Sequence, residues 1–273
     1  MNNENVEEKV EGSNRSTVDS GRLSIVPNIF TLLNLFFGCI AIVLIVQTGL
    51  AVSVDASGQQ TVEIPQKIYW ASIFIGIAAV VDFFDGFVAR LLKASSEMGK
   101  QLDSLADVVS FGVAPGMIVF EFLRRSFAAQ QNGLDINIIY LLPAFIIPCA
   151  GAYRLARFNI DTEQSYGFKG VPIPAAGLLI ASFPLLYWFS NSEWIVNLLQ
   201  NKWFWYAVIF SVSYLMVSTL PMMAMKFKQV NFKSLLPFII IAAIAIITAA
   251  IFGWLAVPVT FIAYVILSLI FKQ

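Results

Sequence analysis

"VVDFFDGFVARLLKASSEMGKQLDSLADVVSFG", residues 80–112, places four aspartates in two stretches that are otherwise rich in Val, Phe, Leu and Ala. They are Asp82, Asp85, Asp103 and Asp107. Both stretches are apolar enough to lie in hydrocarbon, where one aspartate costs roughly 2.5–3.5 kcal/mol even by lenient insertion measurements. Four together cost on the order of 10 kcal/mol, with their mutual repulsion added. A chain that keeps them there needs a partner that neutralises them.

The composition of the whole chain is that of a polytopic membrane protein. Of its 273 residues, 58% are hydrophobic and only 12% are charged, and the mean hydropathy is +0.77. Soluble domains carry about 25% charged residues. The formal net charge is zero, so bulk charge indicates no acidic partner, and we expect no nucleic-acid partner.

The apolar residues fall into eight stretches, each long enough or nearly so to cross about 30 Å of hydrocarbon as a helix. We expect them at 29–48, 68–93, 99–123, 138–159, 171–190, 203–222, 234–252 and 255–271. A sharp turn at Gly253 must separate the last two. Residues 1–21 are polar and lack the layout of a signal peptide, which predicts a mobile tail. The expected fold class is therefore an all-α integral membrane protein of about eight transmembrane helices.

Lysine and arginine set the expected orientation. With the N-terminus inside, all but four of the 17 basic residues lie on the cytoplasmic side. The exceptions are Lys67, Arg124, Arg125 and Lys202. We therefore expect both termini, and the aspartates near the loop between the second and third spans, to face the cytoplasm. The expected location is the cytoplasmic membrane, as a multi-pass protein.

Histidine is absent from the chain. This excludes Ser-His-Asp and Cys-His nucleophiles, phosphohistidine intermediates and histidine metal sites. The two cysteines, Cys39 and Cys149, lie in apolar runs without disulfide or zinc spacing, and we interpret them as small hydrophobic residues. Acid–base or metal chemistry must therefore use carboxylates.

Helical spacing places the aspartates on two faces. Asp82 and Asp85 share one face of the second span with Gly86 and Ala89, at i, i+3, i+4 and i+7. Asp103 and Asp107 are one turn apart on the third span, and Gly99 precedes them by one turn. The linker is short, so the two helices should be antiparallel neighbours with opposed acidic faces.

Divalent cations would make this arrangement tolerable. Carboxylate oxygens are hard ligands suited to Mg²⁺ or Mn²⁺, and two such ions would offset most of four negative charges. Gly86 and Ala89 leave room for a group such as a diphosphate to lie against the helix. The alternative is that the four are surface carboxylates paired with basic residues near helix ends.

The spacing of these residues resembles a family signature. Asp82-x₂-Asp85-Gly86-x₂-Ala89-Arg90-x₈-Gly99-x₃-Asp103-x₃-Asp107 matches every fixed position of the pattern of the CDP-alcohol phosphatidyltransferases. That resemblance implies a membrane enzyme with a core of about six helices, which we assign to 22–222. It leaves 223–273 as a C-terminal pair of helices.

The resemblance also implies residue roles. The family transfers a phosphatidyl group from CDP-diacylglycerol to an alcohol and releases CMP, with divalent metal ions as cofactors. Asp82, Asp85 and Asp103 would ligate two metal ions, and Asp107 would contribute as ligand and act as general base. The remaining implied contacts to CDP-diacylglycerol are Thr31, Asn34, Asp82, Gly86, Ala89, Arg90 and Gly99. For Thr31 and Asn34 the alternative is hydrogen bonding between helices.

The flanking sequence is similar to the phosphatidylserine synthase branch of the family. The segments are "PNIFTLLNLFFG" at 27–38, "SFGVAP" at 110–115, "YRLARFN" at 153–159 and "FKGVPIPAA" at 168–176. Serine has a carboxylate, which arginine binds in a bidentate manner. Arg154, Arg157 and Asn159 are therefore candidates for binding serine or phosphate, and topology with headgroup contact is the alternative for the arginines.

The expected partners are CDP-diacylglycerol, L-serine and membrane lipids, with a homodimer possible by resemblance. One alternative function is the same chemistry on another acceptor, glycerol 3-phosphate or inositol phosphate. An alternative of another class is a cation- or proton-coupled transporter, since carboxylates within a membrane also mark ion pathways.

Overall fold

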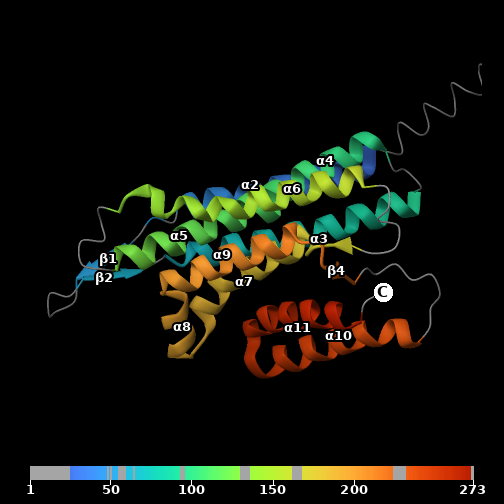
Figure 1. Ribbon diagram of the computed structural model, residues 1–273. Helices are drawn as coiled ribbons and strands as arrows, with labels where there is room; N and C mark the ends of the chain where they lie inside the picture. The colour runs from blue at the N-terminus through green and yellow to red at the C-terminus, as the bar shows by residue number, and fades with distance from the viewer. Residues whose placement is uncertain are drawn as a thin grey trace, which may run out of the picture.

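The computed structural model describes residues 25–47, 49, 51–54, 60–63, 65–92, 96–129, 136–161, 168–223 and 232–271. The expected tail at 1–21 lies outside these residues. The longer helices are α2 (Ile25–Val46), α3 (Lys67–Leu92), α4 (Glu97–Asp107), α5 (Ala114–Ala128), α6 (Ile146–Ile160), α7 (Ile173–Phe189), α9 (Lys202–Val217), α10 (Phe232–Phe252) and α11 (Ala256–Ile270). From α2 to α9 these helices run along the long axis of one bundle (Figure 1).

Four helical stretches of the described chain are long and apolar enough to cross a membrane. They are Pro27–Val46, Lys67–Leu92, Glu97–Ala128 and Leu235–Ile270. Two further apolar helices, Ile173–Phe189 and Lys202–Val217, are shorter. The structure thus agrees with a helical membrane protein. The count of eight spans and the cytoplasmic termini stay predictions.

The third expected span is one continuous helical run with a change of pitch inside it. It starts at Ser96, whose side-chain oxygen accepts a hydrogen bond from the Gly99 amide at 3.0 Å and so caps α4. A π-helix, η1 (Val108–Val113), follows α4 directly and leads into α5. The wider π-helical turn adds a residue to the helix immediately after Asp107, which rotates α4 relative to α5.

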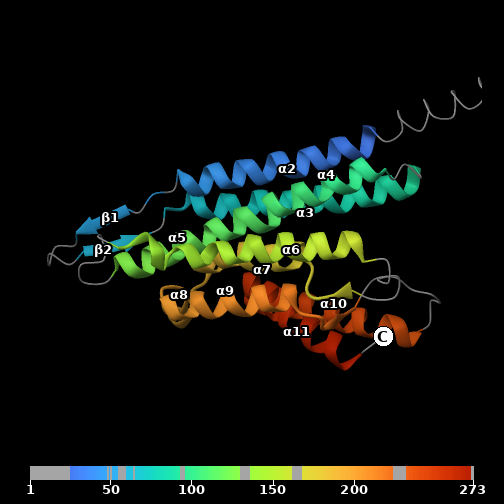
Figure 2. The same cartoon turned by 45° about the horizontal axis from the view of Figure 1, so that its top comes forward.

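The last two expected spans form a hairpin. The backbone of Gly253 has φ +58°, in the left-handed region that glycine adopts without steric cost. A short 3₁₀ turn, η5 (Gly253–Leu255), reverses the chain, and α10 and α11 pack against each other. The predicted turn at Gly253 is confirmed. Figure 2 shows the hairpin, in red, against one side of the bundle, where α11 contacts α7.

The fold is mostly helical, as predicted, and the described residues add two short pairs of strands that the sequence analysis did not predict. An antiparallel pair, β1 (Ala51–Val54) with β2 (Gln60–Glu63), links α2 to α3. A second pair, β3 (Phe168–Lys169) with β4 (Pro221–Met222), joins two connections that are distant in sequence. Backbone groups in these connections have no helical partner, and pairing with each other satisfies them.

Two helix boundaries also differ from the prediction. The span expected at 138–159 begins with two 3₁₀ turns, η3 (Ile138–Tyr140) and η4 (Leu142–Phe145), because Pro143 lacks the amide that an α-helix needs there. The connection after α7 contains a short helix, α8 (Glu193–Leu199). At seven residues it is too short to register as a membrane span.

Small residues allow the helices to pack closely around η1. An added Cβ at Gly177 of α7 would lie 2.8 Å from the backbone oxygen of Phe111, and one at Gly38 of α2 would collide with Ser110. The Ser110 hydroxyl donates to the Asn34 backbone oxygen at 3.0 Å. The segment that follows Asp107 is therefore fixed between α2 and α7.

Candidate metal and substrate site

Three of the four aspartates lie together. Asp82 is on α3, and Asp103 and Asp107 are one turn apart on α4. Each offers a carboxylate oxygen, and these oxygens lie within 4.8 Å of one another. Helix α2 packs against both α3 and α4, so it holds the two helices around this cluster. The prediction that the two acidic faces oppose each other is confirmed.

Asp85 lies beside this group rather than within it. Its carboxylate accepts a hydrogen bond from the hydroxyl of Thr31 on α2, and that hydroxyl also lies 3.3 Å from the Pro27 backbone oxygen. Asp85 and Thr31 are both buried. Asp85 is therefore held by α2, while the other three carboxylates remain directed at one another.

Within the described residues, none of the three clustered carboxylates forms an ion pair. In the part of the chain that the structure describes, the ion pairs are Arg124–Glu121 and Lys169–Asp161, and neither involves the cluster. The Asn34 amide nitrogen lies 3.5 Å from Asp82 Oδ1, a weak contact with a neutral donor. Among the described residues, buried Oδ1 of Asp107 has no hydrogen-bond partner. Convergent, unpaired carboxylate oxygens fit the preference of Mg²⁺ or Mn²⁺ for hard oxygen ligands.

A cavity of about 330 Å³ opens beside the carboxylates. Its lining residues are Pro27, Asn28, Thr31, Asp82, Asp85, Gly86, Ala89, Ser96, Gly99, Lys100 and Asp103. Most of the residues predicted to contact the nucleotide lipid are in this set. A Cβ built on Gly86 would meet no protein atom within 4 Å, so the helix face at Gly86 is open to a bound group.

Six of the predicted site residues do not line this cavity, and Arg90, Asn34 and Asp107 are three of them. Arg90 is exposed, and its Nε donates to the backbone oxygen of Gly86 at 2.9 Å, one turn back on its own helix. Asn34 is fully buried behind Asp82. Asp107 is 7% exposed and lies deeper in the bundle than the cavity lining.

Sequence reasoning missed Pro27, Asn28, Ser96 and Lys100 as cavity residues. The signal was helical spacing, because Asn28 lies three residues before Thr31 and Lys100 lies three before Asp103. Ser96 is a helix cap, and its position follows from the start of α4. Each extends a face that the sequence had already indicated.

Arg154 is a buried cation near the cluster. It lies on α6, is 5% exposed, and its charge interacts with that of Asp107. Within the described chain its Nε has no hydrogen-bond partner. Of the three residues predicted to bind serine or phosphate, Arg154 is the one with an unpaired buried donor beside the site.

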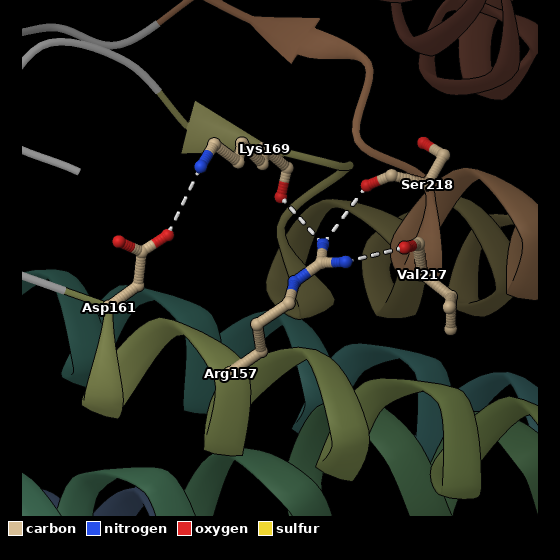
Figure 3. A network of polar contacts seen from close by, with 5 residues as sticks. All are labelled: Arg157, Asp161, Lys169, Val217 and Ser218. Carbon is tan, nitrogen blue, oxygen red and sulfur yellow. Dashed lines mark hydrogen bonds and ion pairs between the residues drawn. The ribbon is translucent and has the colours of Figure 1, made fainter. Parts of the chain in front are cut away.

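Arg157 and Asn159 bind other parts of the protein. The Arg157 guanidinium donates to the backbone oxygens of Val217 at 2.7 Å, Ser218 at 3.0 Å and Lys169 at 3.4 Å (Figure 3). The Asn159 amide donates to the Ser104 hydroxyl at 2.8 Å. Both side chains link segments of the protein that are distant in sequence, and neither lines the cavity.

The family described as CDP-alcohol phosphatidyltransferase matches residues 24–212, which is more than half of the chain. The chain belongs to the CDP-alcohol phosphatidyltransferase family. The match covers α3 and α4 with their aspartates and ends within α9. It leaves α10 and α11 outside the matched segment.

Two bacterial proteins that are similar to this chain carry the same name. A protein of Helicobacter pylori strain J99 is 36% identical over 166 residues, which is 60% of this chain and 59% of the relative. One of Bacillus subtilis is 38% identical over 127 residues, 44% of this chain and 63% of the relative. Both are named CDP-diacylglycerol–serine O-phosphatidyltransferase. The chain thus spans about three fifths of the length of these relatives.

An archaeal relative carries a closely related name. The protein of Methanothermobacter thermautotrophicus is named archaetidylserine synthase and is 36% identical over 123 residues, which is 44% of this chain and 48% of the relative.

Proposed function

We propose that this protein transfers the phosphatidyl group of CDP-diacylglycerol to the hydroxyl of L-serine, giving phosphatidylserine and CMP. The observation that carries the proposal is the cluster of three carboxylates within 4.8 Å of one another beside a cavity of about 330 Å³. The names of the similar proteins support serine as the acceptor. The family membership supports the class of reaction.

Asp82, Asp103 and Asp107 would hold Mg²⁺ or Mn²⁺, with Asp85 completing the set for two ions. Bound ions would neutralise the diphosphate and stabilise the negative charge on the departing CMP. Thr31 donates to Asp85 and so directs that carboxylate. The cluster keeps its oxygens close together because α2 braces α3 and α4.

Asp107 is the proposed general base. In a direct displacement, the serine oxygen forms a bond to the phosphorus that carries diacylglycerol. The bond from that phosphorus to the oxygen bridging to CMP breaks, and CMP leaves with that oxygen. The proton of the serine hydroxyl passes to the Asp107 carboxylate. Oδ1 of Asp107 is free to accept it, since this oxygen has no hydrogen-bond partner among the described residues.

The cavity suits the nucleotide part of the lipid. The open helix face at Gly86 and Ala89 leaves room for the diphosphate between α3 and α4. Lys100 contributes positive charge to the same wall, and Thr31 and Asn28 contribute polar groups. The chain also presents large apolar side chains on α2 and α3 to the outside of the bundle, such as Phe36 and Phe87, against which acyl chains can pack.

Arg154 is the proposed ligand of the serine carboxylate. Its guanidinium is always protonated and its charge interacts with that of Asp107, so it can hold serine with the hydroxyl near the base. Arg157 and Asn159 hold the end of α6 in place through their hydrogen bonds to Val217 and Ser104.

We further propose eight membrane spans with both termini in the cytoplasm, a catalytic core at 22–222 and a C-terminal pair at 223–273. The bias of lysine and arginine toward one side supports this orientation. The site then opens to the cytoplasm.

The test is CMP release by the purified protein in detergent with CDP-diacylglycerol, Mg²⁺ or Mn²⁺, and one alcohol at a time. We expect CMP and phosphatidylserine in equal amounts with L-serine. Equal or faster turnover with glycerol 3-phosphate or inositol phosphate would show that serine is not the preferred acceptor. Metal-dependent ion flux in proteoliposomes without CMP release would identify a transporter instead.

A further inference from the structure

Three hydrogen bonds form a ring between the first turns of α4 and the end of α6. The Lys100 ammonium donates to the Asn159 backbone oxygen at 3.1 Å. The Asn159 side-chain amide donates to the Ser104 hydroxyl at 2.8 Å, and that hydroxyl donates to the Lys100 backbone oxygen at 3.1 Å. Lys100 is thus tied to α6 both directly and through Ser104.

The end of α6 offers Lys100 a fixed anchor. Backbone oxygens in the last turn of a helix have no amide partner within the helix, and positive charge is favourable there. Asn159 is the residue before the last of α6, so its oxygen is one of these acceptors. Arg157, in the same turn, donates to the backbone oxygens of Val217 and Ser218 and so fastens this end of α6 to the end of α9 (Figure 3). The ammonium of Lys100 is therefore held at a defined place.

Lys100 is also part of the wall of the cavity beside the carboxylates. The other charged residues of that wall are Asp82, Asp85 and Asp103, so Lys100 is the basic side chain among the cavity residues. It lies three residues before Asp103 on α4, but among the described residues its ammonium binds a neutral carbonyl and forms no ion pair with a carboxylate. An ammonium has three N–H donors, and the Asn159 oxygen takes one of them. The charge of Lys100 and its remaining donors are therefore available to a ligand in the cavity.

We propose that Lys100 binds the diphosphate of CDP-diacylglycerol, and that Asn159 is a positioning residue for Lys100 rather than a ligand of serine. The inference rests on the proposed function, in which this cavity holds the nucleotide lipid and the aspartates hold metal ions. Side chains three residues apart on a helix are neighbours, so phosphate oxygens bound at a metal ion on Asp103 lie in reach of Lys100. Lysine binds phosphate as a point charge, which suits a group that metal ions bind at the same time. Through Ser104, the Asn159 side chain holds the turn of α4 that carries Lys100 against α6.

The first test is Lys100→Met, which keeps an unbranched side chain and removes the charge. Binding of CDP to the purified protein in detergent is measured by titration calorimetry at saturating Mg²⁺ or Mn²⁺. We expect the Kd for CDP to rise about tenfold or more, the size typical of losing a hydrogen bond to a charged group. The dependence of this Kd on NaCl concentration should also become weaker, because salt screens the lost attraction. The matched control is Lys67→Met, since Lys67 is exposed at the start of α3 and lies outside the cavity lining.

A second set of variants tests the positioning role. Asn159→Leu removes the amide that donates to Ser104 and keeps a similar shape, and Ser104→Ala removes the same hydrogen bond from the other side. We expect each to raise the Kd for CDP about threefold, since one neutral hydrogen bond is lost. If Asn159 acts through Lys100, neither change should raise this Kd further in a Lys100→Met background. The KM for L-serine in Asn159→Leu should stay at the wild-type value, and Lys100→Arg, which keeps the charge, should retain most of the affinity for CDP.

The outcomes are distinct. An unchanged Kd for CDP in a folded Lys100→Met protein would overturn the inference, and so would an equal rise in Lys67→Met. Full additivity of Asn159→Leu with Lys100→Met, or a raised KM for serine in Asn159→Leu with an unchanged Kd for CDP, would overturn the positioning role of Asn159. Wild-type protein that binds CDP in a Lys100-dependent manner but releases no CMP with serine would support this inference and overturn the proposed function.

Discussion

Asp107 is buried, and one of its carboxylate oxygens accepts no hydrogen bond from the described residues. It ends α4, is 7% exposed, and its Oδ1 has no hydrogen-bond partner in the described chain. Asp85 differs, because Thr31 occupies one of its oxygens. Two aspartates with the same side chain therefore have different capacities to accept a proton, and this difference comes from what α2 places beside each.

Asp107→Asn tests the assignment of the base. The amide has the same shape but cannot accept the serine proton, so we expect kcat for CMP release to fall by about 10²–10⁴-fold. Because Asp107 is also a proposed metal ligand, the assay uses saturating Mg²⁺ or Mn²⁺, at which binding of CDP-diacylglycerol should change little. Glu193→Gln is the control, since Glu193 is an exposed carboxylate on α8. Activity within tenfold of wild type would refute the role of Asp107.

Gly86→Val tests the open helix face. Since nothing lies within 4 Å of a Cβ at Gly86, the variant should fold, and its side chain should occupy the cavity instead. We expect KM for CDP-diacylglycerol to rise by at least roughly 10–200-fold, the range for one extra methylene in a fitted pocket, because valine adds three carbon atoms.

Gly76→Val is the matched control for Gly86→Val. Gly76 lies on the same helix and has equally open surroundings, but it does not line the cavity. A similar loss in both variants would show that α3 itself tolerates no valine, and would leave Gly86 without a substrate role.

For single residues, the sequence predicted positions that follow from helical spacing. It did not predict side chains whose hydrogen-bond partners are backbone atoms. Asp82, Asp103 and Asp107 converge as their spacing predicts. Arg157 carried the same sequence signal as Arg154, but it binds carbonyls of residues 60 and 61 positions later. No pattern in the sequence specifies which backbone oxygens a folded chain leaves exposed.

Between helices, the π-helix η1 connects a packing contact with α7 to the position of Asp107. The close approach of Gly177 to Phe111 fixes η1, which begins at the residue after Asp107. Gly177→Ala would force the two apart, and we expect a loss of stability of about 1–3 kcal/mol, typical of overpacking. Thermal unfolding in detergent measures this loss.

The control for Gly177→Ala is Gly76→Ala, whose new methyl group meets nothing within 4 Å. We expect reduced CMP release from Gly177→Ala even below its unfolding temperature, because η1 carries the displacement to Asp107. Equal unfolding temperatures for the two variants would contradict the close contact.

Helix existence was predictable, while the connections were not. Long apolar runs predicted α2, α3 and the α10–α11 hairpin to within about four residues at each end. The pairing of β3 with β4 joins residues 168–169 to 221–222, and no local pattern encodes a contact over such a distance. The π-helix was also missed, because its hydrogen bonds shift by one residue without any change in hydropathy.

For the molecule as a whole, we expect the acidic cluster to make stability depend on divalent ions. Chelation with EDTA should abolish CMP release and lower the unfolding temperature, and Mg²⁺ or Mn²⁺ should restore both. A ligand that binds only the folded state adds about 2.7 kcal/mol at a hundredfold excess over its Kd.

The control for chelation is a double variant, Asp82→Asn with Asp103→Asn. With two of the three clustered carboxylates replaced, its unfolding temperature should no longer respond to Mg²⁺ or Mn²⁺. Full wild-type activity in EDTA would contradict a metal-dependent mechanism.

The contacts of Arg157 have a consequence for how such chains can diverge. Its guanidinium donates hydrogen bonds to the main-chain oxygens of residues 169, 217 and 218. Because these bonds do not involve side chains, the residue types at the three positions can vary in related sequences. A one-residue insertion or deletion within the last turn of α9 would displace the Val217 and Ser218 oxygens relative to the guanidinium. Length at this end of α9 should therefore be preserved more strictly than residue identity.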